Sequence, residues 1–373
     1  MLVVGAGPAG SSTAIRLAGA GARVLLLDRA RFPRDKPCGG GLTGRALRNA
    51  PCDVATVVEH DVDGFVVRVG YRRRTARRAG STVIRMTQRR RLDQYLVEHA
   101  VAVGADFRDG IRVDELRVED DGVKVRANGT RARASFVVGA DGANGVVARA
   151  AGLGDGIVRG VALEGNAPWA VLSPAPFTAT AWVELGVVPG GYGWVFPKGD
   201  HANLGVGGWM GEGPRLRAHL DRLARAHGLD PAELEDVRGH RLPMRWLGAP
   251  AARGRVLLVG DAAGLVDPLS GDGIYEAFVS GRLAAEAILD GQPEMYEAAL
   301  SAALDRHAGA SWKAKRAADR YPSICLWALR APGVFDTVVG LLRGDLAHPA
   351  DASRVAQPPL RVLSRLARSA PAD

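Results

Sequence analysis

The chain has few cysteines and no disulfide or zinc pattern. Its 373 residues include three cysteines, Cys38, Cys52 and Cys325. Three thiols this far apart are too few and too scattered for a disulfide framework or a tetrahedral zinc site. We therefore expect a protein of the reducing cytoplasm that carries no metal centre.

Long apolar runs are also missing. A membrane-spanning helix needs about 20 predominantly apolar residues, and the longest candidate, residues 324–342, is interrupted by Arg330, Pro332 and Asp336. The N-terminus enters a predicted strand at once, which leaves no room for a signal peptide. Low-complexity segments and repeats are absent as well. A chain of this length with 47% apolar and 24% charged residues predicts a globular protein of about two domains.

Acidic residues are outnumbered, and the net charge is +9. The densest basic clusters are residues 72–74, 77–78 and 89–91, all arginine. Such runs are usually a solvated face, but an anionic substrate such as a pyrophosphate, or an anionic membrane surface, would also explain them. Nucleic acid is disfavoured because no recognition module or interleaved aromatic residues accompany the runs.

The strongest motif lies in residues 2–28. An apolar strand runs into Gly5-x-Gly7-x-x-Gly10, a helix follows, and a second apolar strand ends at Asp28. The three glycines allow a tight turn, close approach of a pyrophosphate and close helix–strand packing, and the acid is placed to bind a ribose. This order predicts a dinucleotide-binding unit, and the motif alone leaves NAD and FAD both open.

Two later segments have the same character. Residues 134–142 form an apolar strand that ends at Asp141-Gly142, a pair that is either an ordinary turn or a functional acid. Residues 255–264 form another strand, which opens into Gly260-Asp261 and is followed by a Gly/Pro loop and a helix over residues 275–289. We expect both to join the N-terminal sheet.

The middle of the chain differs. Alternating apolar and polar residues predict antiparallel strands within residues 156–208, and short strands within residues 62–85. We predict an α/β protein with a discontinuous dinucleotide-binding domain (residues 1–60, 86–155 and 250–292). An antiparallel-sheet substrate domain (61–85 and 156–249) is inserted in it, and a helical region (293–373) follows.

Together, these motifs resemble FAD-dependent oxidoreductases of the p-hydroxybenzoate hydroxylase type, and within them the geranylgeranyl reductase family. The signal that separates this family from flavin halogenases is Pro-Gly-Gly-Tyr-Gly-Trp-Val-Phe-Pro at residues 189–197, which is similar to the family's Pro-x-x-Tyr-x-Trp-x-Phe-Pro motif. The resemblance implies a Rossmann-like FAD-binding domain and covers roughly residues 1–289.

The resemblance also implies a set of cofactor contacts. The fingerprint glycines would hold the FAD pyrophosphate, and Asp28 the adenosine ribose. The loop over residues 32–41 would lie over the flavin, and the backbone of residues 273–274 would face its pyrimidine ring, where the helix dipole favours a reduced, anionic flavin. The predicted FAD-binding residues are Gly5, Gly7, Gly10, Asp28, Arg29, Cys38, Gly39, Gly41, Arg89, Val113, Asp141, Asp261, Gly273 and Ile274.

On a strand, Tyr192, Trp194 and Phe196 point to one face. Such a row is most often core packing, but the resemblance favours an apolar tunnel for a prenyl chain. The implied reaction is hydride transfer from reduced FAD to an isoprenoid double bond. The proton would come from Cys38, Tyr192 or a water molecule, with Cys38 favoured because of its glycine-rich loop.

Other expectations concern partners. Since no second dinucleotide fingerprint exists, NAD(P)H would act transiently, or a ferredoxin-type reductant would replace it. We expect a monomer or weak oligomer. The short basic amphipathic segment over residues 360–368 suggests peripheral contact with the inner face of the cell membrane. The alternative function is an FAD-dependent monooxygenase or halogenase acting on an aromatic or polyketide compound. A non-catalytic flavin- or nucleotide-binding regulator is a third possibility.

Overall fold

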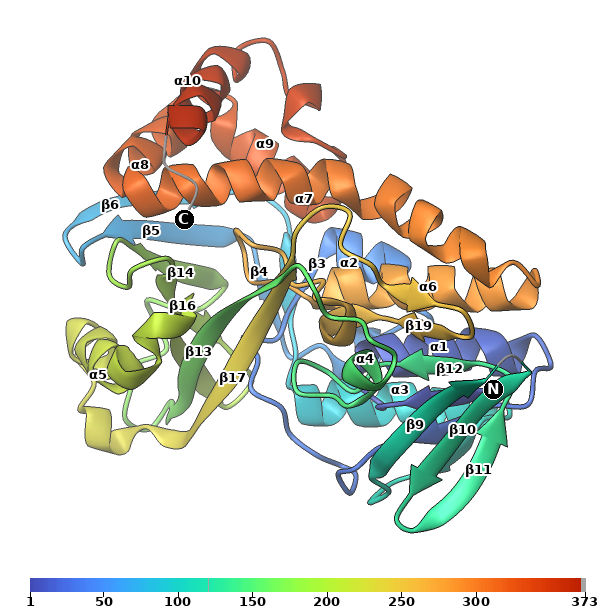
Figure 1. Cartoon of the computed structure of the whole chain (residues 1–373). Coiled ribbons are helices and arrows are strands. Elements are labelled where there is room, and N and C mark those ends of the chain that lie inside the picture. The colour runs from blue at the N-terminus through green and yellow to red at the C-terminus, as the bar shows by residue number, and fades with distance from the viewer. Residues whose placement is uncertain (120, 370–373) are drawn as a thin grey trace.

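A parallel sheet forms one half of the protein. The computed structural model describes residues 1–119 and 121–369. The sheet has six strands in the order β18-β19-β12-β1-β2-β8, and all are parallel except β18; β12 and β19 are labelled in Figure 1. Its strands are β18 (Ala252–Arg253), β19 (Val256–Leu258), β12 (Val137–Gly139), β1 (Leu2–Val4), β2 (Leu25–Leu27) and β8 (Asp106–Arg108).

The sheet brings together segments from the two ends of the predicted nucleotide fold. Strand β1 pairs with β2 and with β12, and β12 pairs with β19. These short strands are almost wholly apolar and buried, as expected of parallel strands covered on both faces. Helix α1 (Pro8–Gly19) packs against α6 (Ile274–Leu289) and α3 (Arg89–Ala102). The later strand–loop–helix segment therefore completes the N-terminal fold.

The second half is a seven-stranded sheet in the order β17-β13-β16-β15-β14-β5-β6. Neighbours are antiparallel except β14 and β5, which run parallel. Its strands are β17 (Glu235–Arg245), β13 (Ile157–Pro168), β16 (His201–Trp209), β15 (Tyr192–Pro197), β14 (Thr180–Leu185), β5 (Gly64–Val69) and β6 (Arg73–Arg78). Helix α5 (Leu216–Ala226) covers β16, and Leu220 and Leu223 on its inner face are fully buried.

Two small sheets and two short helices complete these halves. Strands β3 (Gly41–Thr43), β7 (Ile84–Met86) and β4 (His60–Val62) form one antiparallel sheet, so the ends of the 62–85 segment lie outside the large sheet. Strands β9 (Val113–Glu119), β10 (Gly122–Ala127) and β11 (Thr130–Ala134) form the other. The short helices are α2 (Gly44–Asn49) and α4 (Val147–Ala150).

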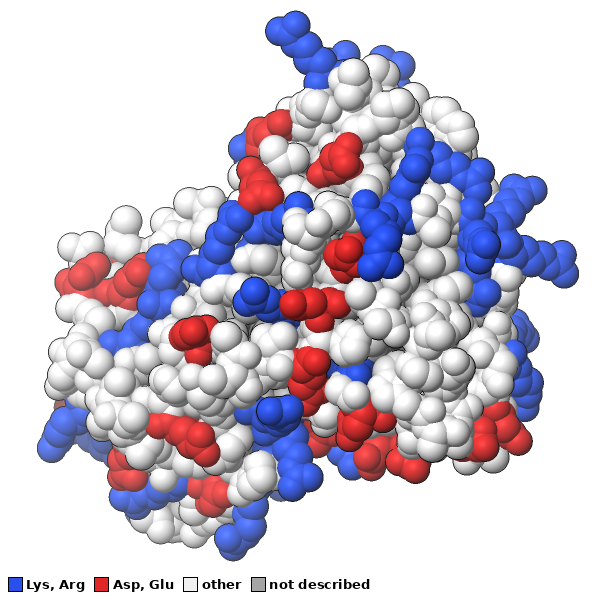
Figure 2. Space-filling model, turned by 180° about the vertical axis from the view of Figure 1, so that it is seen from behind, with Lys and Arg blue, Asp and Glu red and all other residues white. Residues whose placement is uncertain are grey.

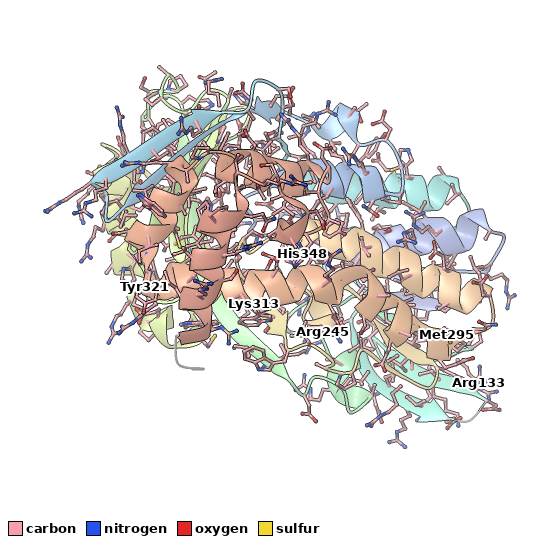
Figure 3. The ribbon with its side chains drawn as sticks, turned by 90° about the horizontal axis from the view of Figure 1, so that it is seen from above. Arg133, Arg245, Met295, Lys313, Tyr321 and His348 are labelled. Atoms are coloured by element: carbon pink, nitrogen blue, oxygen red, sulfur yellow. The ribbon has the colours of Figure 1, made fainter. Side chains whose placement is uncertain are left out.

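The C-terminal helices connect the two halves. They are α7 (Tyr296–Arg320), α8 (Pro322–Arg330), α9 (Val334–Arg343) and α10 (Gln357–Ser369). Helix α7 runs along the top of both sheets (Figure 1), and in the view from above Met295 and Tyr321 mark its two ends (Figure 3). No single described helix is long and apolar enough to cross a membrane; the pair α8 and α9 passes that test together but is bent by 94°.

Two buried hydrogen bonds fix α7 to the sheets. The hydroxyl of Tyr296, at its start, donates to the carbonyl of Leu258 in β19 at 2.6 Å. About two-thirds of the way along, the indole of Trp312 donates to the carbonyl of Arg245 in β17 at 3.2 Å and stacks on Trp246. Because these acceptors belong to different sheets, α7 fixes the position of one sheet relative to the other.

We predict that Tyr296→Phe lowers the free energy of unfolding by about 1–3 kcal/mol, because it leaves the fully buried Leu258 carbonyl without its donor. Denaturant unfolding measures the difference. The matched control is Tyr95→Phe, which removes a hydrogen bond to Asp53 at an exposed site where water can replace it. Equal losses for the two variants would contradict the role given to Tyr296.

Candidate cofactor and substrate site

The glycines of the fingerprint are required by backbone approach. Gly5 has φ +102°, a conformation that L side chains rarely adopt, and a Cβ on it would lie 2.2 Å from the carbonyl oxygen of Ala140. A Cβ on Gly10 would lie 1.8 Å from the carbonyl oxygen of Gly5. Helix α1 begins after Gly7 with no side chain capping its N-terminus. This end of the helix therefore offers N–H groups and a positive dipole to an anion.

Asp28, at the end of β2, holds the loops around this turn. Its Oδ2 accepts the N–H of Ala6 at 2.8 Å, and its Oδ1 accepts the N–H of Ala30 at 2.9 Å. The side chain of Arg34 lies 3.7 Å from the same carboxylate. Asp28 thus lies beside the fingerprint, where the sequence predicts a ribose-binding acid.

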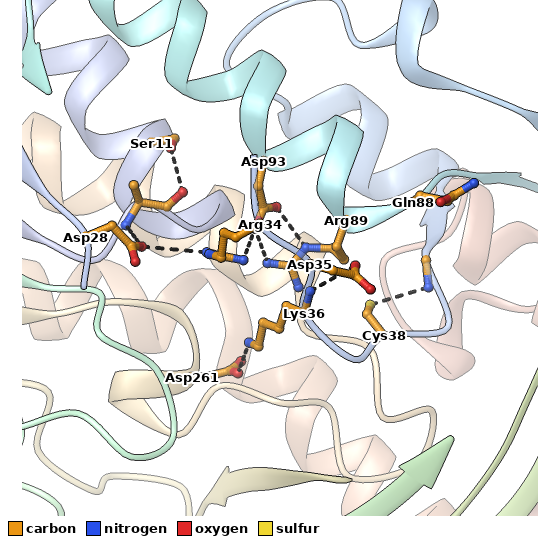
Figure 4. A network of polar contacts seen from close by, with 12 residues as sticks. Ser11, Asp28, Arg34, Asp35, Lys36, Cys38, Gln88, Arg89, Asp93 and Asp261 are labelled. Carbon is orange, nitrogen blue, oxygen red and sulfur yellow. Dashed lines mark hydrogen bonds and ion pairs between the residues drawn. The ribbon is translucent and has the colours of Figure 1, made fainter. Parts of the chain in front are cut away.

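Two arginines converge on the N-terminus of α1 (Figure 4). Arg89 binds the fully buried Asp93 through Nε and Nη2, both at 2.8 Å, and Arg34 Nη1 binds the same carboxylate at 2.6 Å. A Cβ on Gly7 would lie 3.6 Å from Arg34 and 3.7 Å from Arg89. Burial lowers the pKa of Arg89, but Asp93 raises it above its usual value, so the guanidinium stays charged. Two guanidinium groups therefore lie at the predicted pyrophosphate site, both paired with Asp93 and one of them, Arg34, also with Asp28.

A third basic residue lies at the far end of this network. Lys36 Nζ binds Asp261 Oδ2 at 2.8 Å, and His240 Nε2 lies 3.3 Å from the same oxygen. Burial raises the pKa of Asp261, but Lys36 and His240 outweigh it and hold that pKa well below its usual value. Arg34 and Lys36 were missed as individual site residues, although both lie in the loop that the sequence placed over the flavin.

The loop from Cys38 to Gly41 is held from the seven-stranded sheet. Glu164 Oε1, on β13, accepts the N–H of Cys38 at 2.7 Å. Lys198, only 2% exposed, donates to the carbonyls of Gly39 at 2.6 Å and Thr87 at 2.8 Å. Burial lowers the pKa of Lys198 and raises that of Glu164 to about 6. Neither residue was predicted from the sequence; the pairing of β13, β16 and β15 puts Glu164 in one cross-strand row with Gly205 and Trp194.

The aromatic row of β15 faces this loop. The rings of Tyr192 and Trp194 lie 5.9 Å apart, and those of Trp194 and Phe196 lie 6.3 Å apart. Trp194 donates to Asn203 Oδ1 at 2.8 Å and lies over Gly205 on the neighbouring strand, where a Cβ would be 2.0 Å from its ring. A Cβ on Gly39 would lie 2.9 Å from Phe196. The row is therefore packed against the predicted flavin-side loop, and its use as a tunnel stays a prediction.

The other end of the row meets the loop before α6. The Tyr192 hydroxyl donates to the carbonyl of Ser270. Asp267 Oδ1 accepts the N–H groups of Leu269 and Ser270, and Asp272 Oδ1 accepts the N–H of Ile274 at 3.0 Å. The Ile274 N–H, predicted to face the flavin, thus already has an acceptor, and Gly273 is the N-cap of α6. Burial raises the pKa of Tyr192.

A buried charged cluster lies beneath this loop. Arg45 Nη1, on α2, is 2.5 Å from His307 Nε2, and its Nη2 is 3.7 Å from both Asp272 and Glu276. Ligand atoms of Asp267, Glu276 and His307 lie within 4.8 Å of one another, an arrangement that could hold a metal ion. The guanidinium of Arg45 already supplies positive charge there. Burial raises the pKa of Glu276 well above its usual value, and Arg45 opposes that shift.

The remaining predicted residues are Asp141, Val113 and Arg29. Asp141 Oδ2 accepts the N–H groups of Val146 and Val147 at 2.6 and 3.0 Å, and so caps the short helix α4. Val113 begins β9 and is buried, while Arg29 is exposed. Asp141 therefore has a structural role, and cofactor contacts for these three residues stay predictions.

Taken together, these residues fit an FAD molecule. The uncapped helix start and the guanidinium groups of Arg34 and Arg89 suit a diphosphate, and Asp28 and Asp261 suit the hydroxyl groups at its two ends. Asp28 and Asp261 are far apart in the sequence, but the parallel sheet brings them to the same site. Asp28 follows β2 and Asp261 follows β19, and only β1 and β12 lie between these two strands.

We predict that Glu164→Gln stabilises the protein relative to the wild type as the pH rises from 4.5 to 6. Because the pKa of Glu164 is raised to about 6 in the folded protein, the protonated side chain contributes to the wild-type free energy of unfolding. This contribution is fully present below pH 4.5 and is lost as the pH rises through about 6. The glutamine keeps an acceptor for Cys38 without the charge, so the difference should grow by up to about 2 kcal/mol. Unfolding at a series of pH values measures it, with exposed Glu235→Gln as control. A difference that stays constant with pH would contradict the burial of this charge.

Comparison with known proteins indicates an FAD-binding family. The family described as FAD binding domain matches residues 1–161. A geranylgeranyl diphosphate reductase of Rhodobacter capsulatus is 33% identical over 300 residues, which cover 77% of this chain and 74% of that protein. A menaquinone reductase of Mycobacterium tuberculosis is 34% identical over 316 residues, covering 77% and 76%.

Solved structures agree with the predicted fold class. A geranylgeranyl bacteriochlorophyll reductase-like protein of Thermoplasma acidophilum superposes with a TM-score of 0.78 at 25% identity, covering 98% of each chain. A flavin-dependent brominase gives 0.73 at 20% identity over 98% of each chain, which shows the fold alone. The predicted α/β FAD-binding fold is confirmed, and the chain belongs to the geranylgeranyl reductase family of FAD-dependent oxidoreductases.

Proposed function

We propose that this protein saturates isoprenoid carbon–carbon double bonds, geranylgeranyl or polyprenyl, on a prenyl lipid, a prenylated quinone or a prenyl diphosphate. The observation that carries the proposal is the position of the aromatic row. Tyr192 contacts the loop before α6, and Phe196 contacts the Cys38–Gly41 loop. An apolar chain lying along the row would therefore pass both loops that the sequence assigns to the flavin.

The chain's own residues suit the cofactor's polar and reactive ends. The N-terminus of α1 with Arg34 and Arg89 would bind the FAD diphosphate, and Asp28 and Asp261 would bind its hydroxyl groups. Bound FAD, once reduced, supplies a hydride for the alkene. NAD(P)H or a ferredoxin-type protein is the proposed source of electrons.

Recognition of a prenyl chain must come from shape and burial, because an isolated alkene offers no polar group to bind. Each buried CH₂ contributes about 0.8 kcal/mol, so a long chain gains ample affinity without hydrogen bonds. The polar tips of Tyr192 and Trp194 are already satisfied by Ser270 and Asn203. The hydroxyl of Tyr192 and the indole N–H of Trp194 therefore need no polar partner from the substrate.

Anaerobic turnover tests the function. The purified protein, loaded with FAD and reduced with dithionite without oxygen, should convert at least one of geranylgeranyl diphosphate, a menaquinone and an unsaturated archaeal-type ether lipid. Mass spectrometry would detect a gain of two hydrogens per bond. The alternative is a monooxygenase or halogenase: products that require oxygen, with no anaerobic saturation, would establish it instead. Protein that binds no FAD would refute both.

Substitutions of the two candidate proton donors should differ. The Tyr192 hydroxyl already donates to a carbonyl, and burial raises its pKa, so we predict that Tyr192→Phe keeps kcat within a few-fold. Cys38→Ser replaces the thiol by a weaker acid and should lower kcat by about 100-fold, typical for loss of a general acid. Unchanged FAD binding in both variants is the control, and the opposite ranking would assign the proton to Tyr192.

A further inference from the structure

The edge strand of the large sheet carries an unusual concentration of positive charge. Strand β6 and the turn before it contain five exposed arginines, which we call the basic edge: Arg72, Arg73, Arg74, Arg77 and Arg78. Lys and Arg side chains gather on this side of the molecule in the view from behind (Figure 2). Because β6 has a neighbour on one side only, nothing in the large sheet covers it.

Little of this charge is neutralised within the fold, although Arg77 donates a hydrogen bond to the Arg330 carbonyl at 3.4 Å. Arg78 pairs with Asp63, and the described residues provide no carboxylate partner within 4.0 Å for the other four. Like charges close together on one strand repel each other. The basic edge therefore costs stability, and a partner with negative charge would remove that cost.

An exposed aromatic residue lies on the helix beside the basic edge. Helix α8 is fixed to β6 because Arg330 donates to the Thr75 hydroxyl at 2.7 Å and to the Arg74 carbonyl at 2.8 Å. Trp327, one turn earlier, is 57% exposed and forms the solvent side of this apolar helix. Tryptophan beside arginine is a typical combination at the interface between bilayer and water.

The predicted membrane segment over residues 360–368 lies in α10. This helix packs along α7 and α8, and Ala367 on its inner side is 1% exposed. Packing against other helices uses part of the apolar face that a membrane would need. The exposed anchor of this region is therefore Trp327 and not the inner face of α10.

We infer that the basic edge and Trp327 dock this protein on a bilayer of anionic phospholipids. Arg73 and Arg77 lie on the same face of β6 as Thr75. This is the face against which α8, the helix of Trp327, is held. The aromatic row lies on β15, three strands from β6 in the same sheet. At about 4.8 Å per strand this is about 15 Å, a distance that a prenyl chain can span. The inference that substrate enters from the bilayer rests on the proposed function. The inference that the protein docks on the bilayer does not.

Sedimentation with vesicles tests the docking surface without turnover. The full chain should bind vesicles of phosphatidylcholine and phosphatidylglycerol in equal parts, weakly at high salt, and should not bind phosphatidylcholine alone. The double variant Arg73→Glu and Arg77→Glu should weaken binding by at least about tenfold, and Trp327→Ala by several-fold. The matched control is Arg112→Glu with Arg131→Glu, which makes the same charge change on the distant β9–β11 sheet.

Equal binding by the two double variants would overturn the inference, because it would mean that net charge alone attracts the protein. Retention on RNA while anionic vesicles stay free would overturn it in favour of nucleic acid. Vesicle binding by protein that fails to saturate any prenyl substrate would support docking and count against the proposed reaction. Circular dichroism of each variant verifies that it is folded.

Discussion

Burial of charge at the seam between the two sheets is the constraint on which this structure depends. A charge removed from water is tolerated only when it is paired and hydrogen-bonded. Asp93 is fully buried between Arg34 and Arg89, and Asp261 lies between Lys36 and His240. Each of these carboxylates binds one basic residue from the loop over residues 32–41. The loop can therefore occupy only a position in which both ion pairs form.

The same loop is also fixed from the opposite side. Glu164 and Lys198 belong to the seven-stranded sheet, and they hold the backbone of Cys38 and Gly39. Both halves of the protein thus position this loop directly. Helix α7 sets the distance between the halves through Tyr296 and Trp312. A shift of either sheet would therefore move Cys38, which explains how a fold of two sheets can hold one thiol in place.

Local patterns were sufficient to predict most of the elements but not the contacts between them. The apolar strands, the glycine fingerprint and the alternating strands around Tyr192 depend on neighbours in the sequence, so they could be read directly. The parallel pairing of β5 with β14 could not, because it joins segments that are more than 100 residues apart and lack a connecting motif. Charged residues are the hardest case. Glu164 and Lys198 look like ordinary polar positions until the fold removes them from water.

The aromatic row limits where selectivity between substrates can arise. Tyr192 and Trp194 are each held by a hydrogen bond at the ring's polar tip, and Gly205 leaves room for the indole. The rings are therefore preorganised, and a prenyl chain would bind them without ordering them first. Every isoprene unit presents similar apolar surface, so contact with the row distinguishes chain length but not the group to which the chain is attached. Discrimination between a quinone, a diphosphate and a glycerolipid must then come from residues beyond the row. Under the proposed function, that choice would fall to the charged groups that line the two loops and to the bilayer surface from which the chain would enter.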